Sequence, residues 1–102
     1  MDKIVFITGA SSGIGAGCAR KFASQGASLI LNARNVNKLT ALKEELEKQY
    51  GAKIYLLPFD VRDRKAATSA LESLPKEWQS IDILVNNAGL VIGTDREQEG
   101  QI

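Results

Sequence analysis

Residues 3–15 of the chain read KIVFITGASSGIG, and this stretch decides the fold. Its first six residues are almost continuously apolar, which is typical of a parallel strand that is buried on both faces. A glycine-rich turn follows at once, and a helical pattern begins directly after it. In such a strand-turn-helix unit, backbone N–H groups and the positive end of the helix dipole converge on one point. The stretch therefore predicts a site for an anionic group such as a pyrophosphate.

The three glycines of the turn have separate roles in this prediction. Gly9 permits the tight turn, Gly13 lets a ligand approach the backbone, and Gly15 allows the helix to pack closely on the strand. The spacing Gly-x-x-x-Gly-x-Gly differs from the common Gly-x-Gly-x-x-Gly, and it is not a P-loop because no Gly-Lys-Ser/Thr follows. Hydrolysis of ATP or GTP is therefore not indicated, whereas a turn that binds no ligand remains open on this motif alone.

Strand and helix patterns alternate along the rest of the chain. After the strand at 3–8, β-rich runs at 28–31, 53–57 and 81–85 are separated by three helical patterns. This alternation predicts an α/β fold, an open parallel sheet with right-handed crossovers and, in a doubly wound arrangement, strand order 3-2-1-4. The apolar stripes expected on the three helices are Ile14, Cys18 and Phe22, then Leu39, Leu42 and Leu46, and finally Ala67, Leu71 and Leu74.

Local signals mark where the helices begin and end. Asn35 or Asn37 is expected to cap the second helix, and Asp63 is expected to cap the third. Gly26 and Gly51 are expected to end the first and second helices, because glycine tolerates the left-handed conformation found there.

The composition limits the partners of the chain. It is expected to form one domain, 1–102, and its 13 basic and 12 acidic residues leave a net charge of only +1. This balance does not indicate a nucleic-acid partner or a polybasic membrane anchor. No apolar run is long enough for a signal peptide or a membrane span. With one cysteine and no histidine, an internal disulfide and a multi-cysteine metal site are excluded, which favours a cytoplasmic location.

Three motifs follow three of the predicted strands in order. They are the pattern Thr-Gly-x-x-x-Gly-x-Gly at 8–15, Asp-Val at 60–61 and Asn-Asn-Ala-Gly at 86–89. Together they resemble the short-chain dehydrogenase/reductase family over about residues 3–93. The resemblance implies a Rossmann-type fold with a site for a nicotinamide dinucleotide along the carboxyl ends of the strands, where ligands of open α/β sheets bind.

The resemblance also assigns parts of the cofactor to parts of the chain. The backbone at 9–14 would hold the diphosphate, and the pair at 60–61 would contact the adenine. Residues 87–89 would line the adenosine ribose and the space leading toward the nicotinamide. With the cation discussed next, the cofactor-binding residues expected are Gly9, Ala10, Ser11, Ser12, Gly13, Ile14, Gly15, Arg34, Asp60, Val61, Asn87, Ala88 and Gly89.

The end of the second strand predicts which cofactor binds. NAD enzymes place an acidic side chain about 20 residues beyond the glycines to bind the ribose 2′-hydroxyl. In this family that acid would align with Ala33, and the next residue is Arg34, whose guanidinium can pair with a 2′-phosphate. NADP(H) is therefore the expected cofactor, and an ordinary exposed arginine is the alternative.

The catalytic residues that the resemblance implies are not found in the sequence. The family would use a serine and a Tyr-x-x-x-Lys pair, supported by an asparagine, all beyond residues 86–89. Tyr50 has Lys53 three residues later rather than four, and Tyr55 has no lysine four residues on. We assign no catalytic residue and expect a chain truncated before the catalytic half.

Two readings of the function follow. The first is the cofactor-binding portion of an NADP(H)-dependent oxidoreductase that interconverts a small-molecule alcohol and a ketone. Residues 74–84 resemble the matching segment of 3-hydroxy acid dehydrogenases that act on serine- or threonine-type substrates. The alternative is a non-catalytic NADP(H)-binding or assembly module that works through a partner chain.

The expected sheet also predicts self-association. Two of its helices would cover one face and only the third would cross to the other, so that most of that face would be bare. The strand at 81–85 would present an unpaired apolar edge. We therefore expect the chain to fold poorly alone or to form a homo-oligomer.

Three further residues carry expectations of their own. Cys18 is expected to be a buried, inert thiol on the apolar side of the first helix. Trp78 is expected to pack over the end of the sheet, with a role in assembly as the alternative. Asp82 is either a hydrogen-bonding support or a charge at the rim of the sheet.

Overall fold

The computed structural model describes residues 2–90 of the chain. Four parallel strands form one sheet in the order β3-β2-β1-β4, which confirms the predicted fold and strand order. Phe6 in the middle of β1 lies between Ile30 of β2 and Leu84 of β4. The strands are β1 (Ile4–Thr8), β2 (Ser28–Leu31), β3 (Ile54–Leu56) and β4 (Ile83–Asn86). The helices are α1 (Gly13–Ser24), α2 (Val36–Tyr50), α3 (Arg64–Glu72) and the short 3₁₀ helix η1 (Lys76–Trp78).

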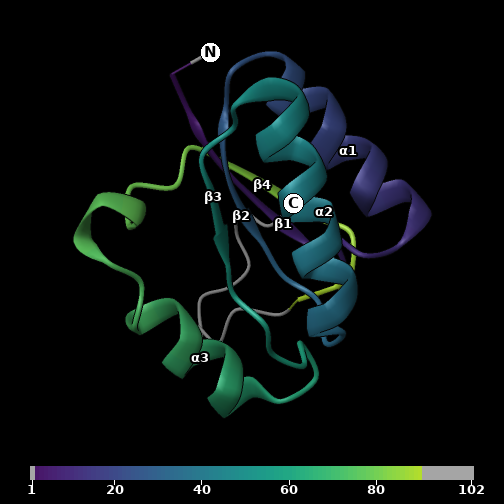
Figure 1. Cartoon of the computed structure of the whole chain (residues 1–102). Helices are drawn as coiled ribbons and strands as arrows, with labels where there is room; N and C mark the ends of the chain where they lie inside the picture. The colour runs from purple at the N-terminus through teal and green to yellow at the C-terminus, as the bar shows by residue number, and fades with distance from the viewer. Residues whose placement is uncertain (1, 91–102) are drawn as a thin grey trace.

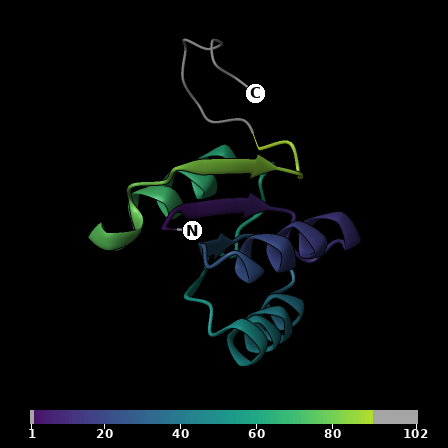
Figure 2. The same ribbon diagram turned by 90° about the horizontal axis from the view of Figure 1, so that it is seen from above.

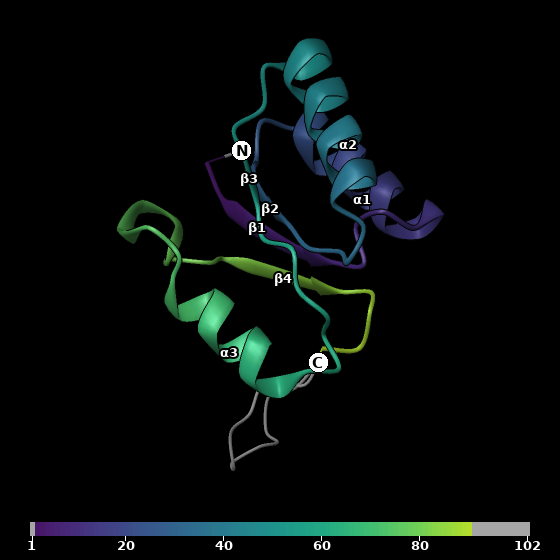
Figure 3. The same ribbon diagram turned by 60° about the horizontal axis from the view of Figure 1, so that its bottom comes forward.

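The helices lie on both faces of the sheet. Helices α1 and α2 cover one face, and α3 lies on the other (Figures 1 and 3). Seen from above, β1 and β4 run side by side in the same direction, and both end toward the turn that enters α1 (Figure 2). The carboxyl ends of the strands therefore share one edge with the glycine-rich turn.

The buried side of α1 differs from the predicted stripe. Gly15, Ala19 and Ala23 are buried against the sheet, whereas Ile14 is 74% exposed. Cys18 and Phe22 are only partly buried and pack at the margin of the core. The helix is thus turned by one residue from the prediction, because small side chains let its backbone approach the strands closely. The thiol is correspondingly half-buried rather than fully buried.

Helix α2 matches its prediction closely. The Asn35 side chain accepts a hydrogen bond from the backbone N–H of Lys38 at 3.1 Å, so Asn35 rather than Asn37 is the cap. Gly51 ends the helix with φ 64°, in the left-handed region. The predicted stripe Leu39, Leu42 and Leu46 is buried. Gly26, after α1, also has a positive φ of 87°.

The face covered by α3 is less bare than predicted. Phe6 and Ile30 are 2% and 0% exposed. They pack in one cluster with residues from α3, η1 and the chain that joins them, and with Leu57, Phe59 and Leu90 from the chain after β3 and β4. Trp78 is buried, and its ring centroid lies 5.6 Å from that of Tyr55. The Lys53 ammonium lies over the Trp78 ring, 5.6 Å from the ring centroid. These contacts confirm that the tryptophan packs over the sheet.

Two aspartates fix the ends of elements on this side. The Asp63 carboxylate accepts a hydrogen bond from the backbone N–H of Ala66 and caps α3, as predicted. The Asp82 carboxylate accepts one from the backbone N–H of Ile4 at 2.9 Å, and the Asp82 N–H donates to the Ile4 carbonyl. Asp82 therefore supports the start of β1 and β4 by hydrogen bonds. Within residues 2–90, β4 has β1 on one side and no strand on the other.

Candidate functional site

The glycine turn closes β1 onto α1 and β2. Gly9 has φ 63°, a conformation that glycine adopts without strain. The Ala10 N–H donates to the Asn32 carbonyl at 2.8 Å, which ties the turn to the end of β2. The Ser12 hydroxyl donates to the Gly9 carbonyl at 2.9 Å and accepts from the Gly15 N–H at 3.0 Å, so Ser12 caps α1. The first turn of the helix is thereby held beside the strand ends.

Gly15 and Gly13 differ in the space around them. A Cβ on Gly15 would overlap the Gly9 carbonyl oxygen and lie 2.9 Å from the Ala10 Cα, so only glycine fits between helix and turn. A Cβ on Gly13 would meet nothing within 4 Å. The backbone at Gly13 is therefore open on this side, and its role in binding a ligand stays a prediction.

The end of β4 is bound to the same turn. The Asn87 side-chain amide donates to the Ser12 hydroxyl at 2.9 Å and to the Gly9 carbonyl at 3.2 Å. The buried Thr8 hydroxyl donates to the Asn86 side-chain oxygen at 3.1 Å and accepts from the Ala88 N–H at 3.0 Å. These bonds join residues nearly 80 positions apart, and they set the shape of the edge without any ligand.

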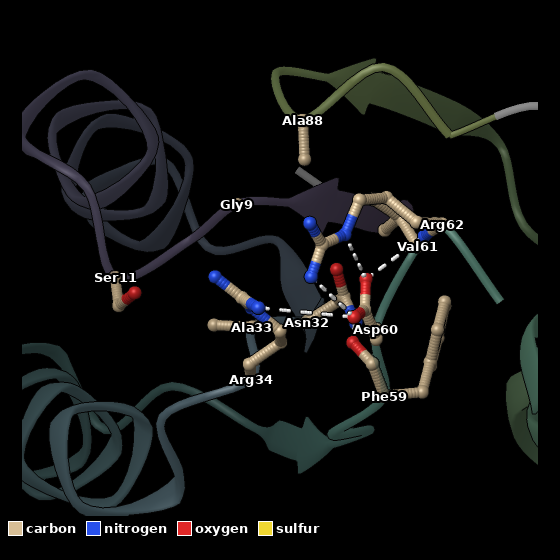
Figure 4. Close-up of a pocket in the computed structure, with 10 residues that line it drawn as sticks. All are labelled: Gly9, Ser11, Asn32, Ala33, Arg34, Phe59, Asp60, Val61, Arg62 and Ala88. Carbon is tan, nitrogen blue, oxygen red and sulfur yellow. Dashed lines mark hydrogen bonds and ion pairs between the residues drawn. The ribbon is translucent and has the colours of Figure 1, made fainter.

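A pocket of about 320 Å³ lies beside the turn at the carboxyl ends of the strands. Its walls come from the ends of β1, β2, β3 and β4, which are far apart in the sequence but adjacent here (Figure 4). The predicted site residues that line it are Gly9, Ser11, Arg34, Asp60, Val61 and Ala88.

The other predicted residues do not line this pocket. Ala10 is buried behind the turn, and residues 12–15 form the cap and first turn of α1. The Asn87 amide is hydrogen-bonded to the turn, and Gly89 lies beyond β4 with φ 74°. The predicted set therefore divides into residues of the pocket wall and residues that border it.

Sequence reasoning missed Asn32 as part of the pocket. Asn32 is 1% exposed, and its side-chain amide donates to the Leu57 and Phe59 carbonyls, both at 3.1 Å. The side chain thus holds the chain after β3 against the end of β2. A polar residue directly after an apolar strand was the available signal.

Arg62 is the second residue that the prediction missed. Its backbone N–H and its Nε donate to Asp60 Oδ1 at 2.9 and 3.1 Å, and its Nη2 donates to Oδ2 at 2.9 Å. Arg34 lies on the other side of the same carboxylate, with its Nη1 3.8 Å from Oδ2 (Figure 4). One carboxylate therefore lies between two guanidinium groups.

These contacts lower the pKa of Asp60 from its ordinary value of 3.8 to about 2. The side-chain hydrogen bonds from Arg62 contribute most, followed by its backbone N–H, with a smaller contribution from the charge of Arg34. Burial acts in the opposite direction. The interactions of this carboxylate therefore stabilise the fold fully above its ordinary pKa, and they are lost as the pH falls through about 2.

Arg62→Gln is expected to raise the pKa of Asp60 from about 2 toward 3.8, because the largest cause of its lowering is removed. NMR titration of the aspartate carboxyl carbons measures this shift directly. An unchanged Asp60 titration in the variant would contradict the hydrogen-bonded pair.

Within residues 2–90, the structure has no helix that is both long enough and apolar enough to cross a membrane. The same residues contain no cluster of three or more histidine, cysteine or acidic side chains suited to hold a metal ion. The polar groups at the pocket are two arginines, one aspartate, one asparagine, one serine and the backbone of the turn.

Comparison with known proteins matches nearly the whole chain to one family. Residues 3–101 match the family described as short chain dehydrogenase. The NADP-dependent 3-hydroxy acid dehydrogenase of Escherichia coli is 43% identical over 99 residues, which make up 97% of this chain. The chain spans 38% of the length of that relative.

Two solved structures have the same fold. Serine dehydrogenase from Escherichia coli is 47% identical with a TM-score of 0.76, over 88% of this chain and 40% of that one. L-sorbose reductase from Gluconobacter frateurii, whose crystal structure contains NADPH and L-sorbose, is 38% identical with a TM-score of 0.80. That match covers 86% of this chain and 34% of the reductase. The sheet order, the glycine turn and the family match agree, and the chain belongs to the short-chain dehydrogenase family.

Proposed function

We propose that the chain binds NADP(H) as the cofactor-binding part of an oxidoreductase that interconverts an alcohol and a ketone. Arg34 carries this proposal, because its guanidinium lines the pocket at the end of β2 and its side chain is 67% exposed. Ala33 stands where an NAD enzyme would have an acid for the ribose 2′-hydroxyl. A cation in this place is suited to a 2′-phosphate, which it can bind through charge-assisted hydrogen bonds.

The other residues at the pocket and the glycine turn fit the adenosine half of such a cofactor. Asp60 and Val61 form the wall that would face the adenine, and the open backbone at Gly13 would receive the diphosphate at the positive end of α1. The pocket volume of about 320 Å³ is at the lower end of the range for ligand sites. When bound, NADPH supplies the hydride for reduction of a carbonyl group. The residues of this chain would bind and orient it.

For the substrate we propose a small alcohol or carbonyl compound, with a 3-hydroxy acid as the first candidate. The names of two relatives, the 3-hydroxy acid dehydrogenase and serine dehydrogenase of Escherichia coli, support this choice. The name of the third, L-sorbose reductase, supports the broader class of alcohol and ketone pairs.

The proposed cofactor preference is tested with 2′,5′-ADP and 5′-AMP. They are the adenosine halves of NADP and NAD, and they differ only in the 2′-phosphate. Isothermal titration of the full-length protein with 2′,5′-ADP and with 5′-AMP is expected to give about ten- to a hundredfold tighter binding of 2′,5′-ADP. This is the range for one hydrogen bond to a charged group. Equal affinities for the two nucleotides would contradict the proposal.

The alternative, a non-catalytic NADP(H)-binding or assembly module, makes a different prediction about turnover. Oxidation of NADPH by the full-length protein that depends on an added ketone or 3-oxo acid would support the oxidoreductase. Tight binding of NADPH without turnover across a panel of such compounds would favour the module.

A further inference from the structure

Arg62 lines the pocket but has no role in the function proposed above. Its side chain is 73% exposed, yet it makes three hydrogen bonds to Asp60 when its backbone N–H is counted. The bonds reach both oxygens of the carboxylate. The side chain is thus oriented by the aspartate rather than extended into solvent.

The position of Arg34 relative to the same carboxylate is different. Its nearest nitrogen is 3.8 Å from Asp60 Oδ2, beyond hydrogen-bond distance, whereas Arg62 Nη2 is 2.9 Å from that oxygen. The two guanidinium groups therefore compete for one acceptor, and Arg62 occupies the hydrogen-bonding position. A carboxylate without Arg62 would be a ready partner for Arg34, because a guanidinium pairs with a carboxylate and a phosphate by the same bidentate geometry.

We propose that Arg62 is a positioning residue that keeps Asp60 from forming a direct hydrogen-bonded pair with Arg34, and so leaves the Arg34 guanidinium available to a 2′-phosphate. The inference rests on the proposed function, since it concerns the phosphate that distinguishes NADP(H) from NAD(H). It adds a residue that acts on specificity through two others without touching the phosphate itself.

The ratio of the dissociation constants of 5′-AMP and 2′,5′-ADP tests the proposal. Both nucleotides contain the adenine, so the ratio isolates the contribution of the 2′-phosphate. In Arg62→Gln we expect the ratio to fall about two- to fivefold, which is the range for competition from one solvent-exposed ion pair. Arg62→Lys keeps the charge but not the planar guanidinium, and its ratio is expected to lie between those of Arg62→Gln and the wild type.

The same substitution in an Asp60→Asn background separates positioning from direct attraction. If Arg62 acts only by hydrogen-bonding the Asp60 carboxylate, its substitution has no further effect once that carboxylate is removed. The double variant and Asp60→Asn alone are then expected to have ratios within about 1.5-fold of each other, whereas independent effects would add. An equal fall in both backgrounds would mean that Arg62 attracts the phosphate itself, and this would overturn the proposal.

The remaining outcomes distinguish this inference from the proposed function. A wild-type ratio near one would contradict the proposed function and the inference together. A high wild-type ratio that Arg62→Gln leaves unchanged would overturn the inference alone. If that variant also had a lower melting temperature, the arginine would only stabilise the chain after β3. Retention of the wild-type circular dichroism spectrum by each variant is the folding control.

Discussion

Arg34→Ala is expected to weaken NADPH binding about ten- to a hundredfold and to change NADH binding by less than about twofold. The two cofactors differ only in the 2′-phosphate, and Arg34 is the cation of the pocket that is not hydrogen-bonded to Asp60. Alanine removes the guanidinium and leaves the rest of the wall intact. Titration of the full-length variant with each cofactor measures the two dissociation constants.

Arg64→Ala is the matched control for Arg34→Ala. It removes the same charge from an exposed residue at the start of α3 that is not part of the pocket wall. Its effect on NADPH binding is expected to stay within about twofold, because exposed charges at a distance are screened by salt. Equal losses for NADPH and NADH in Arg34→Ala would show that the arginine holds the pocket together rather than binding the 2′-phosphate.

The sheet and the glycine turn could be predicted because their signals are local or regular. The apolar run of β1, the glycines after it and the caps Asn35 and Asp63 each depend on a few neighbouring residues. The strand order followed from the doubly wound topology expected for alternating strands and helices with right-handed crossovers. These elements therefore appear in the structure where the sequence places them.

The orientation of α1 could not be read from the same signals. A search for large apolar side chains selects Ile14, but the helix buries Gly15 and Ala19 and leaves Ile14 exposed. Which side of α1 is buried depends on how closely the helix approaches the sheet, and this distance is a property of the packed structure. Small residues in a helix carry little hydrophobic signal even when they form its contact surface.

The polar pocket residues that were missed depend on contacts between separate loops. Asn32 donates hydrogen bonds to the carbonyl groups of Leu57 and Phe59, which lie 25 and 27 residues further along the chain. No spacing pattern in the sequence predicts this pairing. Arg62 lies next to the predicted Asp60 and Val61, but its side chain is directed back to Asp60 only by the conformation of the loop after β3. Asp60 could be identified by its place in a motif, whereas its pairing with Arg62 depends on the folded conformation of the loop.

Gly15→Ala is expected to have the largest effect on stability. The added Cβ would overlap the Gly9 carbonyl oxygen and lie 2.8 Å from the Gly9 carbonyl carbon, and these are backbone atoms that cannot rotate away. Overpacking of this kind typically costs about 1–3 kcal/mol and occasionally more. Relief of the overlap would displace the start of α1 from the turn, so NADPH binding is expected to fall as well. Urea denaturation of the full-length protein measures the free energy of unfolding.

Gly17→Ala provides the control on the same helix. Gly17 is exposed, and a Cβ there would meet nothing within 4 Å, so the variant has the same chemical change without the overlap. Alanine is favoured over glycine in a helix by up to about 1 kcal/mol, and Gly17→Ala is therefore expected to be neutral or stabilising. Opposite signs for two glycines two residues apart would attribute the loss at Gly15 to its contact with the turn. A Gly15→Ala variant as stable as Gly17→Ala would mean that α1 does not lie this close to the end of β1, and the pocket beside the turn would then have a different shape.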